Sequence, residues 1–152
     1  MAKSTKRETA DPLTEAQCLC LNLRRTARAV TRFYDGVLAP SGLRVTQFSL
    51  LATICARGPL TMNALAAALV MDRTTLTRNL RPLEKRGLIA VHPGEDRRER
   101  RVAITAAGTA VVERAQQLWR QAQTRMVTAL GAPGARALLD QLSETASAAR
   151  SG

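Results

Sequence analysis

The chain has 152 residues, the length of one compact domain that also leaves room for dimerisation segments. Apolar residues make up 45% of it, which excludes a fully disordered chain. With one Trp, one Tyr and two Phe, the core must consist mainly of Leu, Ala and Val, as is typical of packed helices. Lys and Arg number 23 against 12 acidic residues, and the formal net charge of +11 favours a polyanionic partner, either nucleic acid or an anionic membrane.

The sequence lacks the residues that several functional classes of protein need. Cys18, Cys20 and Cys55 are an odd number of cysteines without Cys-x-x-Cys spacing, and His92 is the only histidine, so neither a disulfide framework nor a metal site is expected. No nucleophile–base pair or paired carboxylates stand out, so we expect no enzyme, no catalytic residue and no cofactor. The sequence has no apolar run of membrane-spanning length and no N-terminal leader, which predicts a cytoplasmic protein without a membrane partner.

The first long helix follows a polar N-terminal arm. Residues 1–11 show no period and are expected to be flexible, whereas residues 12–152 are expected to form a single domain. From Pro12 to about Leu38 the apolar residues recur at intervals of three and four, which predicts one amphipathic helix. The sequence Pro-Ser-Gly at 40–42 ends it.

Three shorter helices are expected next. Thr46, Thr61 and Asp72 are each suited to cap one of them, because a short side-chain oxygen can accept a free backbone N–H of the first turn. The third helix ends at Gly87, a residue typical of helix C-termini. Pro82 lies inside this helix and is expected to bend it without ending it.

A change of period then indicates a β-hairpin. Ile89 and Val91 alternate with polar residues, as do Val102 and Ile104, and the turn-rich sequence at 93–96 separates the two runs.

Two further helices complete the chain. Thr105 can cap a long one, residues 131–134 break it, and a last short helix carries Leu138, Leu139 and Leu142. The fold class is therefore mainly α with a small β-hairpin wing: a winged helix-turn-helix flanked by helical dimerisation elements. We assign DNA binding to 45–105 and dimerisation to 12–40 and 106–150. A homodimer is expected because no single winged module could bury the apolar stripes at both chain ends.

The third short helix has the pattern of a DNA-reading helix. If Leu76, Leu80 and Leu83 face the core, the opposite stripe carries Thr74, Arg78, Arg81 and Lys85, with Thr75, Thr77 and Asn79 beside it. Arginines can bind guanine through both ends of the guanidinium group, and threonines can bind phosphates or pack on thymine methyl groups. A solvated charged face is the alternative interpretation. The hairpin favours a duplex, because it adds Arg97, Arg98, Arg100 and Arg101 directly after this helix.

Residues 18–131 resemble the MarR (multiple antibiotic resistance regulator) family of bacterial transcription factors. The matching stretches are GLRVTQFSLLATI (42–54), LTMNALAAALVMDRTTLTRNLRPLEKRGLI (60–89) and EDRRERRVAITAAG (95–108). The last contains the family's Asp-x-Arg wing signature at Asp96 to Arg98 and its Thr-x-x-Gly helix start at Thr105 to Gly108. The resemblance implies an obligate dimer in which Arg98 enters the minor groove and Asp96 orients it.

The expected set of DNA-binding residues is based both on this resemblance and on the helix pattern. The resemblance implies that Arg73, Thr74, Thr75, Thr77 and Arg78 face the major groove of a pseudo-palindromic operator. The complete expected set is Arg73, Thr74, Thr75, Thr77, Arg78, Arg81, Lys85, Asp96, Arg97 and Arg98.

The resemblance also implies a signal, since family members usually respond to a phenolic or aromatic acid bound between the dimerisation helices and the DNA-binding module. We expect a repressor released by such a ligand, and the residues that could line its site are Arg24, Arg28, Tyr34, Phe48 and Trp119.

A second interpretation is a redox sensor. Cys20, Arg28 and Tyr34 match the spacing of the family's organic-hydroperoxide sensors. Two positions depart from that pattern, since Arg24 and Val45 stand where aromatic residues are expected, and no second cysteine lies near the C-terminus. Cys18 and Cys20 should lie on nearly opposite faces of the helix, and Cys55 should lie in the core.

Rival classes are a nucleoid protein that coats DNA without sequence preference and a basic membrane-surface protein. The threonine-rich start of the reading helix argues against the former.

Overall fold

The computed structural model describes residues 17–94, 96 and 99–151. The expected N-terminal arm and residues 12–16 of the first predicted helix lie outside the described residues. The helix begins at Leu19 rather than near Pro12, because Cys18 has an extended backbone and caps it, its Sγ accepting the Leu21 N–H at 3.4 Å. In chain order the elements are α1 (Leu19–Leu38), a 3₁₀ turn (Ala39–Ser41), α2 (Val45–Arg57), β1 (Leu60–Thr61), α3 (Met62–Ala68), α4 (Arg73–Lys85), β2 (Ile89–Pro93), β3 (Arg100–Ile104), α5 (Ala106–Leu130) and α6 (Ala132–Ser151).

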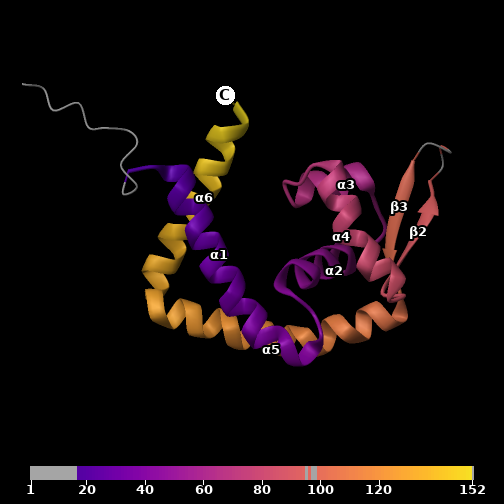
Figure 1. The fold of residues 1–152 in the computed structure, drawn as a ribbon, viewed down its shortest axis with the longest axis horizontal. Coiled ribbons are helices and arrows are strands. Elements are labelled where there is room, and N and C mark those ends of the chain that lie inside the picture. The colour runs from indigo at the N-terminus through magenta and orange to yellow at the C-terminus, as the bar shows by residue number, and fades with distance from the viewer. Residues whose placement is uncertain (1–16, 95, 97–98, 152) are drawn as a thin grey trace, which may run out of the picture.

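The long helix α5 runs along the bottom of the molecule in Figure 1, and the other elements lie above it. At the end where α5 begins, α2, α3, α4 and the strands form the winged module, and α6 rises from the other end. The lower end of α1 lies near the middle of α5. The predicted fold class, mainly α with a β-hairpin wing, is confirmed.

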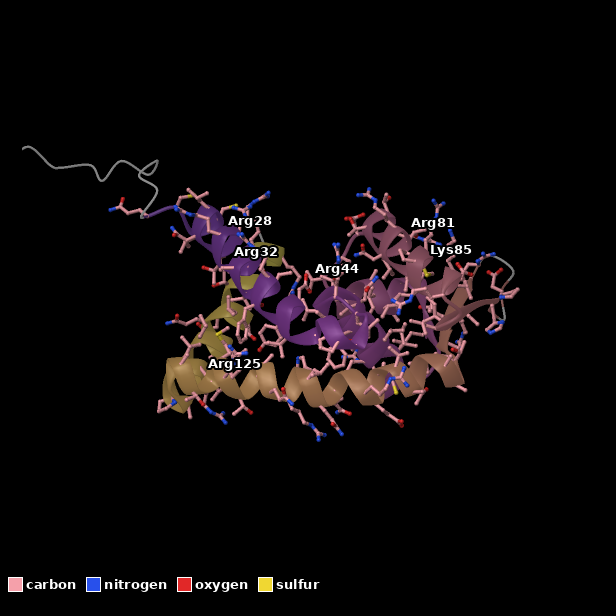
Figure 2. The ribbon with its side chains drawn as sticks, turned by 60° about the horizontal axis from the view of Figure 1, so that its bottom comes forward. Arg28, Arg32, Arg44, Arg81, Lys85 and Arg125 are labelled. Atoms are coloured by element: carbon pink, nitrogen blue, oxygen red, sulfur yellow. The ribbon has the colours of Figure 1, made fainter. Side chains whose placement is uncertain are left out.

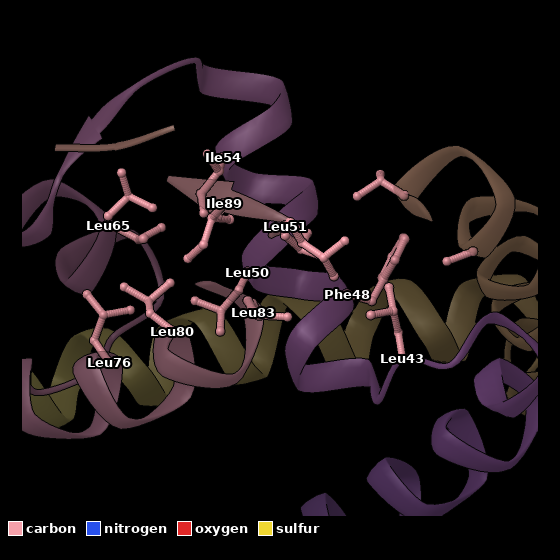
Figure 3. Close-up of a cluster of buried hydrophobic side chains, with 14 of the residues drawn as sticks. Leu43, Phe48, Leu50, Leu51, Ile54, Leu65, Leu76, Leu80, Leu83 and Ile89 are labelled. Carbon is pink, nitrogen blue, oxygen red and sulfur yellow. The ribbon is translucent and has the colours of Figure 1, made fainter. Parts of the chain in front are cut away.

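The core of the winged module consists mainly of aliphatic side chains (Figure 3). Those with essentially no exposed surface are Leu38, Leu50, Leu51, Ile54, Leu65, Leu76, Leu83 and Val102. Phe48 of α2 stacks on Trp119 of α5, with ring centroids 6.0 Å apart. This aromatic contact joins the winged module to the middle of α5.

The predicted hairpin is present and is part of a three-stranded antiparallel sheet in the order β1-β3-β2. Ile89 pairs with Ile104 at one end of the hairpin, and Pro93 pairs with Arg100 at the other. The additional strand β1 is two residues long, too short to show a period in the sequence.

Three of the four expected helix caps are confirmed. Thr61 accepts the Ala64 N–H at 3.1 Å, Asp72 accepts that of Thr75 at 2.8 Å, and Thr105 accepts that of Gly108 at 3.0 Å.

The prediction that Thr46 caps α2 is wrong. The residue before the helix is Arg44, and the N–H of Val45 donates to Oδ1 of Asp35 in α1 at 2.7 Å. The acceptor comes from another helix, so the local sequence could not reveal it.

Two further expectations are corrected. α6 is 20 residues long rather than short, because only Gly131 interrupts the helical backbone and Pro133 lies in the first turn, where no N–H is needed. Cys55 is exposed rather than buried, because the buried residues of α2 end with Ile54. Pro82, as expected, lies within a continuous α4.

Val70, in the turn between α3 and α4, has a left-handed backbone with φ of +51°. This conformation costs an L-residue with a Cβ roughly 1–2 kcal/mol, more than the roughly 0.5–1 kcal/mol of chain entropy that glycine loses on folding. The Val70 side chain is 67% exposed, so little packing is lost with it.

We therefore expect Val70→Gly to raise the free energy of unfolding by about 0.5–1 kcal/mol, measured by urea denaturation at fixed protein concentration. Val70→Ala retains a Cβ and should stay close to wild type. A glycine variant less stable than the alanine variant would contradict the argument.

Candidate nucleic-acid interface

The exposed face of α4 is determined by what the helix buries. Leu76, Leu80 and Leu83 lie in the core, as predicted, and are at most 3% exposed. The opposite stripe is exposed and carries Thr74, Arg78, Arg81 and Lys85. Figure 2 shows Arg81 and Lys85 directed away from the molecule, on the side opposite to α5.

The first turn of α4 depends on Asp72. Its carboxylate accepts the Thr75 hydroxyl at 2.6 Å and the Thr75 backbone N–H at 2.8 Å. The hydrogen bond from the Thr75 hydroxyl lowers the pKa of the Asp72 carboxyl most, and the bond from the Thr75 N–H lowers it further. The Thr75 hydroxyl therefore donates its hydrogen within the protein, to Asp72.

Thr77 is exposed, and its hydroxyl donates to the carbonyl of Arg73 at 2.8 Å. Its methyl group and both lone pairs of its oxygen stay available to a ligand. Thr74 is exposed one turn earlier.

The basic side chains of α4 border two hollows. One, of about 420 Å³, is lined by Arg73, Thr74, Thr77, Arg78 and Arg81. The other, of about 280 Å³, lies between α4 and the hairpin, and Arg73, Arg81, Val91 and Arg100 are among its lining residues. The helix and the wing thus form one concave basic surface, to which Arg100 belongs although the expected set did not include it.

The wing is held by local hydrogen bonds. The N–H of Gly94 donates to Glu99 O and the N–H of Glu99 to Asp96 O, both at 2.8 Å. Glu99 also forms an ion pair with Arg101 at 3.6 Å, in which both side chains are partly exposed. Asp96 is exposed, whereas the expected contacts of Arg97 and Arg98 lie outside the described residues.

The residues expected to sense a signal are dispersed. The hydroxyl of Tyr34, a buried residue, donates to Oε1 of Gln123 in α5 at 2.6 Å, and burial raises the pKa of this phenol. Cys20, Arg24 and Arg28 are exposed on α1. At a rise of 1.5 Å per residue, Cys20 and Tyr34 are separated by about 21 Å of helix, so one protomer does not bring the thiol and the phenol together.

Among the expected ligand-site residues, Phe48 and Trp119 stack on each other, and Phe48 is buried. Local sequence offers no signal for Gln123 as the partner of Tyr34, because the two lie 89 positions apart.

Across residues 17–94, 96 and 99–151, no group of three or more His, Cys, Asp or Glu residues could hold a metal ion. None of the helices described there is both long and apolar enough to cross a membrane.

The comparisons with known proteins agree with this fold. The profile described as MarR family matches residues 41–99. The transcriptional regulator MosR of M. tuberculosis, solved in complex with DNA, is 42% identical over 88% of this chain and 98% of its own, with a TM-score of 0.78. A mutant of MarR from E. coli complexed with operator DNA is 25% identical over 90% of this chain and 99% of its own, with a TM-score of 0.79.

The chain belongs to the MarR family. It is a winged-helix, DNA-binding transcriptional regulator. An uncharacterized HTH-type regulator of Bacillus subtilis, YwoH, is 31% identical over 83 residues, and the match spans 55% of this chain and 61% of that protein.

The Asp72 cap of α4 should make the stability of the folded protein depend on pH. An unperturbed aspartate has a pKa of about 3.9, and the Asp72 pKa is lower in the folded state. Its contribution to stability is therefore complete above the unfolded value and is lost as pH falls through the folded value.

Asp72→Asn retains a good cap but does not titrate. We expect the wild type to lose more stability than this variant between pH 6 and pH 3, as followed by denaturant unfolding of both proteins. Identical pH profiles would show that the carboxylate is not perturbed.

Proposed function

We propose that this MarR-family regulator is a sequence-specific repressor that binds a pseudo-palindromic duplex as a homodimer, in the cytoplasm, and releases it on binding a small aromatic acid. In this proposal residues 45–105 read DNA, and residues 12–40 and 106–150 dimerise. The observation that carries it is the concave basic surface of α4 and the wing. The MosR and MarR complexes with DNA support it by similarity.

In the proposed complex α4 enters the major groove. Arg73 and Arg78 are exposed in the half of the helix that meets base edges most closely, and Thr74 and Thr77 accompany them. Arg81 and Lys85 follow toward the C-terminus, where cations suit phosphates. The wing lies beside the minor groove, which Arg98 enters and toward which Asp96 orients it, as the family resemblance implies. Arg97 belongs to the same expected set of DNA-binding residues.

The exposed apolar surface supports the homodimer. Leu19 is 74% exposed on α1 and Leu139 is 59% exposed on α6. α6 has no buried residue in the single chain. Exposed leucines along helices of this length are typical of a protein interface, and a second copy presents the same surface. The leucines concerned are Leu19, Leu23, Leu130, Leu138, Leu139 and Leu142.

For the signal we favour an acid over a peroxide. Arg24 and Arg28 lie one turn apart on α1, both exposed, and can attract a carboxylate. Cys20 is exposed and accessible to an oxidant, but Tyr34 already donates its hydroxyl to Gln123 and lies about 21 Å of helix away. A peroxide sensor would therefore need its thiolate to be stabilised by the other protomer.

Arg78→Ala tests the reading surface. Operator affinity should fall by about 1–3 kcal/mol, the usual effect of removing a bidentate arginine–guanine contact. Fluorescence anisotropy on an operator recovered from genomic fragments would measure it. The wild type should also lose around 10³-fold in affinity between 50 and 200 mM salt if about six phosphates are neutralised.

Arg114→Ala is the matched control, because it removes the same charge from an exposed position on α5, outside the segment proposed to read DNA. Sedimentation first establishes that this variant is still a dimer. It should bind the operator like wild type. If Arg78→Ala weakened binding equally for operator and unrelated duplex, the nucleoid-protein alternative would be favoured instead.

A second experiment distinguishes the two signals. 4-Hydroxybenzoate should raise the melting temperature of the wild type and release the operator, whereas the neutral phenol should have little effect because it lacks the carboxylate. Arg28→Gln should weaken the response to the acid.

Release by an organic hydroperoxide that is abolished by Cys20→Ser, but not by Cys18→Ser, would replace the acid with the thiol as the sensor.

A further inference from the structure

The end of α4, the start of β2 and the start of α5 meet at Thr105. The N–H of Thr105 donates to the carbonyl of Leu88 at 3.1 Å, and its hydroxyl donates to the carbonyl of Gly87 at 2.7 Å. The same hydroxyl accepts the N–H of Gly108 at 3.0 Å. Thr105 is therefore both the cap of α5 and a tether to two consecutive carbonyls that follow α4.

Gly108 brings the first turn of α5 directly against this segment. A Cβ built on Gly108 would collide with the carbonyl oxygen of Leu88 and lie 2.8 Å from the side chain of Ile104. Gly108 is buried, and its backbone φ is not left-handed, so close approach rather than conformation requires glycine here.

Gly87 and Leu88 are hydrogen-bonded to the last turn of α4. Gly87 has a left-handed φ of +68°, and its N–H donates to Glu84 O at 2.9 Å. The N–H of Leu88 donates to Leu83 O at 3.0 Å, and Leu88 is 4% exposed. These contacts form a helix terminus of the Schellman type, which bonds the three residues after Lys85 to the end of the reading helix.

The other end of α5 belongs to the proposed dimerisation surface. α5 has 25 residues, which corresponds to about 37 Å of helix. Over that length, a rotation of 5° at Thr105 displaces the far end by about 3 Å. A small rotation at this junction thus produces a large displacement of the two reading helices of a dimer relative to each other.

We propose that the junction of Thr105 and Gly108 is the positioning element that sets the orientation of α4 relative to the dimerisation helices. It thereby selects the separation of the two half-sites that the dimer accepts. Thr105 is a positioning residue, since it acts through the Gly87 and Leu88 carbonyls rather than through DNA. The inference rests on the proposed function, in which two copies of α4 read one duplex.

The role as cap and the role as tether can be separated by substitution. Thr105→Asp keeps an oxygen that accepts the Gly108 N–H, but a carboxylate cannot donate to the Gly87 carbonyl. Thr105→Val is uncharged and loses both hydroxyl bonds, whereas Thr105→Ser keeps both. Thr61→Val is the matched control, because within the described part of the chain the Thr61 hydroxyl makes only a cap bond, to Ala64.

The experiment measures affinity for a series of duplexes in which the separation of the half-sites changes by one base pair at a time. Each added base pair rotates one half-site by about 34° relative to the other, given 10–10.5 base pairs per turn. Full-length dimers of the wild type, Thr105→Ser and Thr61→Val should prefer one separation at least tenfold over its neighbours. Thr105→Asp and Thr105→Val should reduce this preference to threefold or less. For each variant the preference is a ratio of affinities, so a uniform change in affinity, including one caused by the aspartate charge, does not affect it.

Each outcome bears on the inference. Flattened profiles for both Thr105→Asp and Thr105→Val support it. If both variants, or Thr105→Asp alone where Thr105→Val does not fold, keep the wild-type profile, Thr105 is only a helix cap and the inference is wrong. If the wild type itself shows no preference among separations or sequences, the proposed function fails as well.

Discussion

The burial of one leucine stripe on α4 determines how this protein presents its charges. Leu76, Leu80 and Leu83 together remove one face of the helix from water, and each buried leucine contributes about 1.5–3 kcal/mol. Rotating α4 about its axis would expose them, so the rotation is strongly constrained. Arg78 and Arg81 consequently face outward. The exposed basic face of α4, which is the proposed DNA-reading surface, is thus a consequence of core packing rather than of any interaction among the basic residues.

That surface carries an electrostatic cost in the free protein. The chain has a formal net charge of +11, and the Glu99–Arg101 ion pair on the wing is exposed, so it offsets little of the repulsion. Phosphates of a duplex would neutralise this charge and release counterions. The cations along α1, including Arg24 and Arg28, are the reason that the proposed signal is an acid.

α5 connects the separate parts of the molecule at successive points. Near its start Thr105 holds the end of α4, in its middle Trp119 stacks on Phe48 of α2, and further on Gln123 accepts the Tyr34 hydroxyl of α1. Arg125 then lies over the ring of Phe33, 5.0 Å from its centroid. A displacement of α1 or α6 can therefore reach α4 through α5, in addition to the direct contact of α1 with α2 through Asp35. In the proposed function these contacts would couple a signal to DNA release.

The sequence by itself determined the features that depend on local contacts. The starts of α3, α4 and α5 were predictable because each cap joins residues three positions apart, and the hairpin was predictable from its period of two. The leucine stripe of α4 likewise follows from helical spacing alone.

The tertiary structure decided what depends on partners distant in sequence. Asp35 replaces Thr46 at the start of α2, β1 joins the sheet, and Cys55 lies on the exposed side of its helix. Cys20 and Tyr34 are far apart because both lie on one continuous helix, α1. The hydrogen bond from Tyr34 to Gln123, in contrast, forms only because α1 packs against α5. In each case the deciding partner is brought close by packing of the core, and no local pattern of residues records which segments that packing brings together.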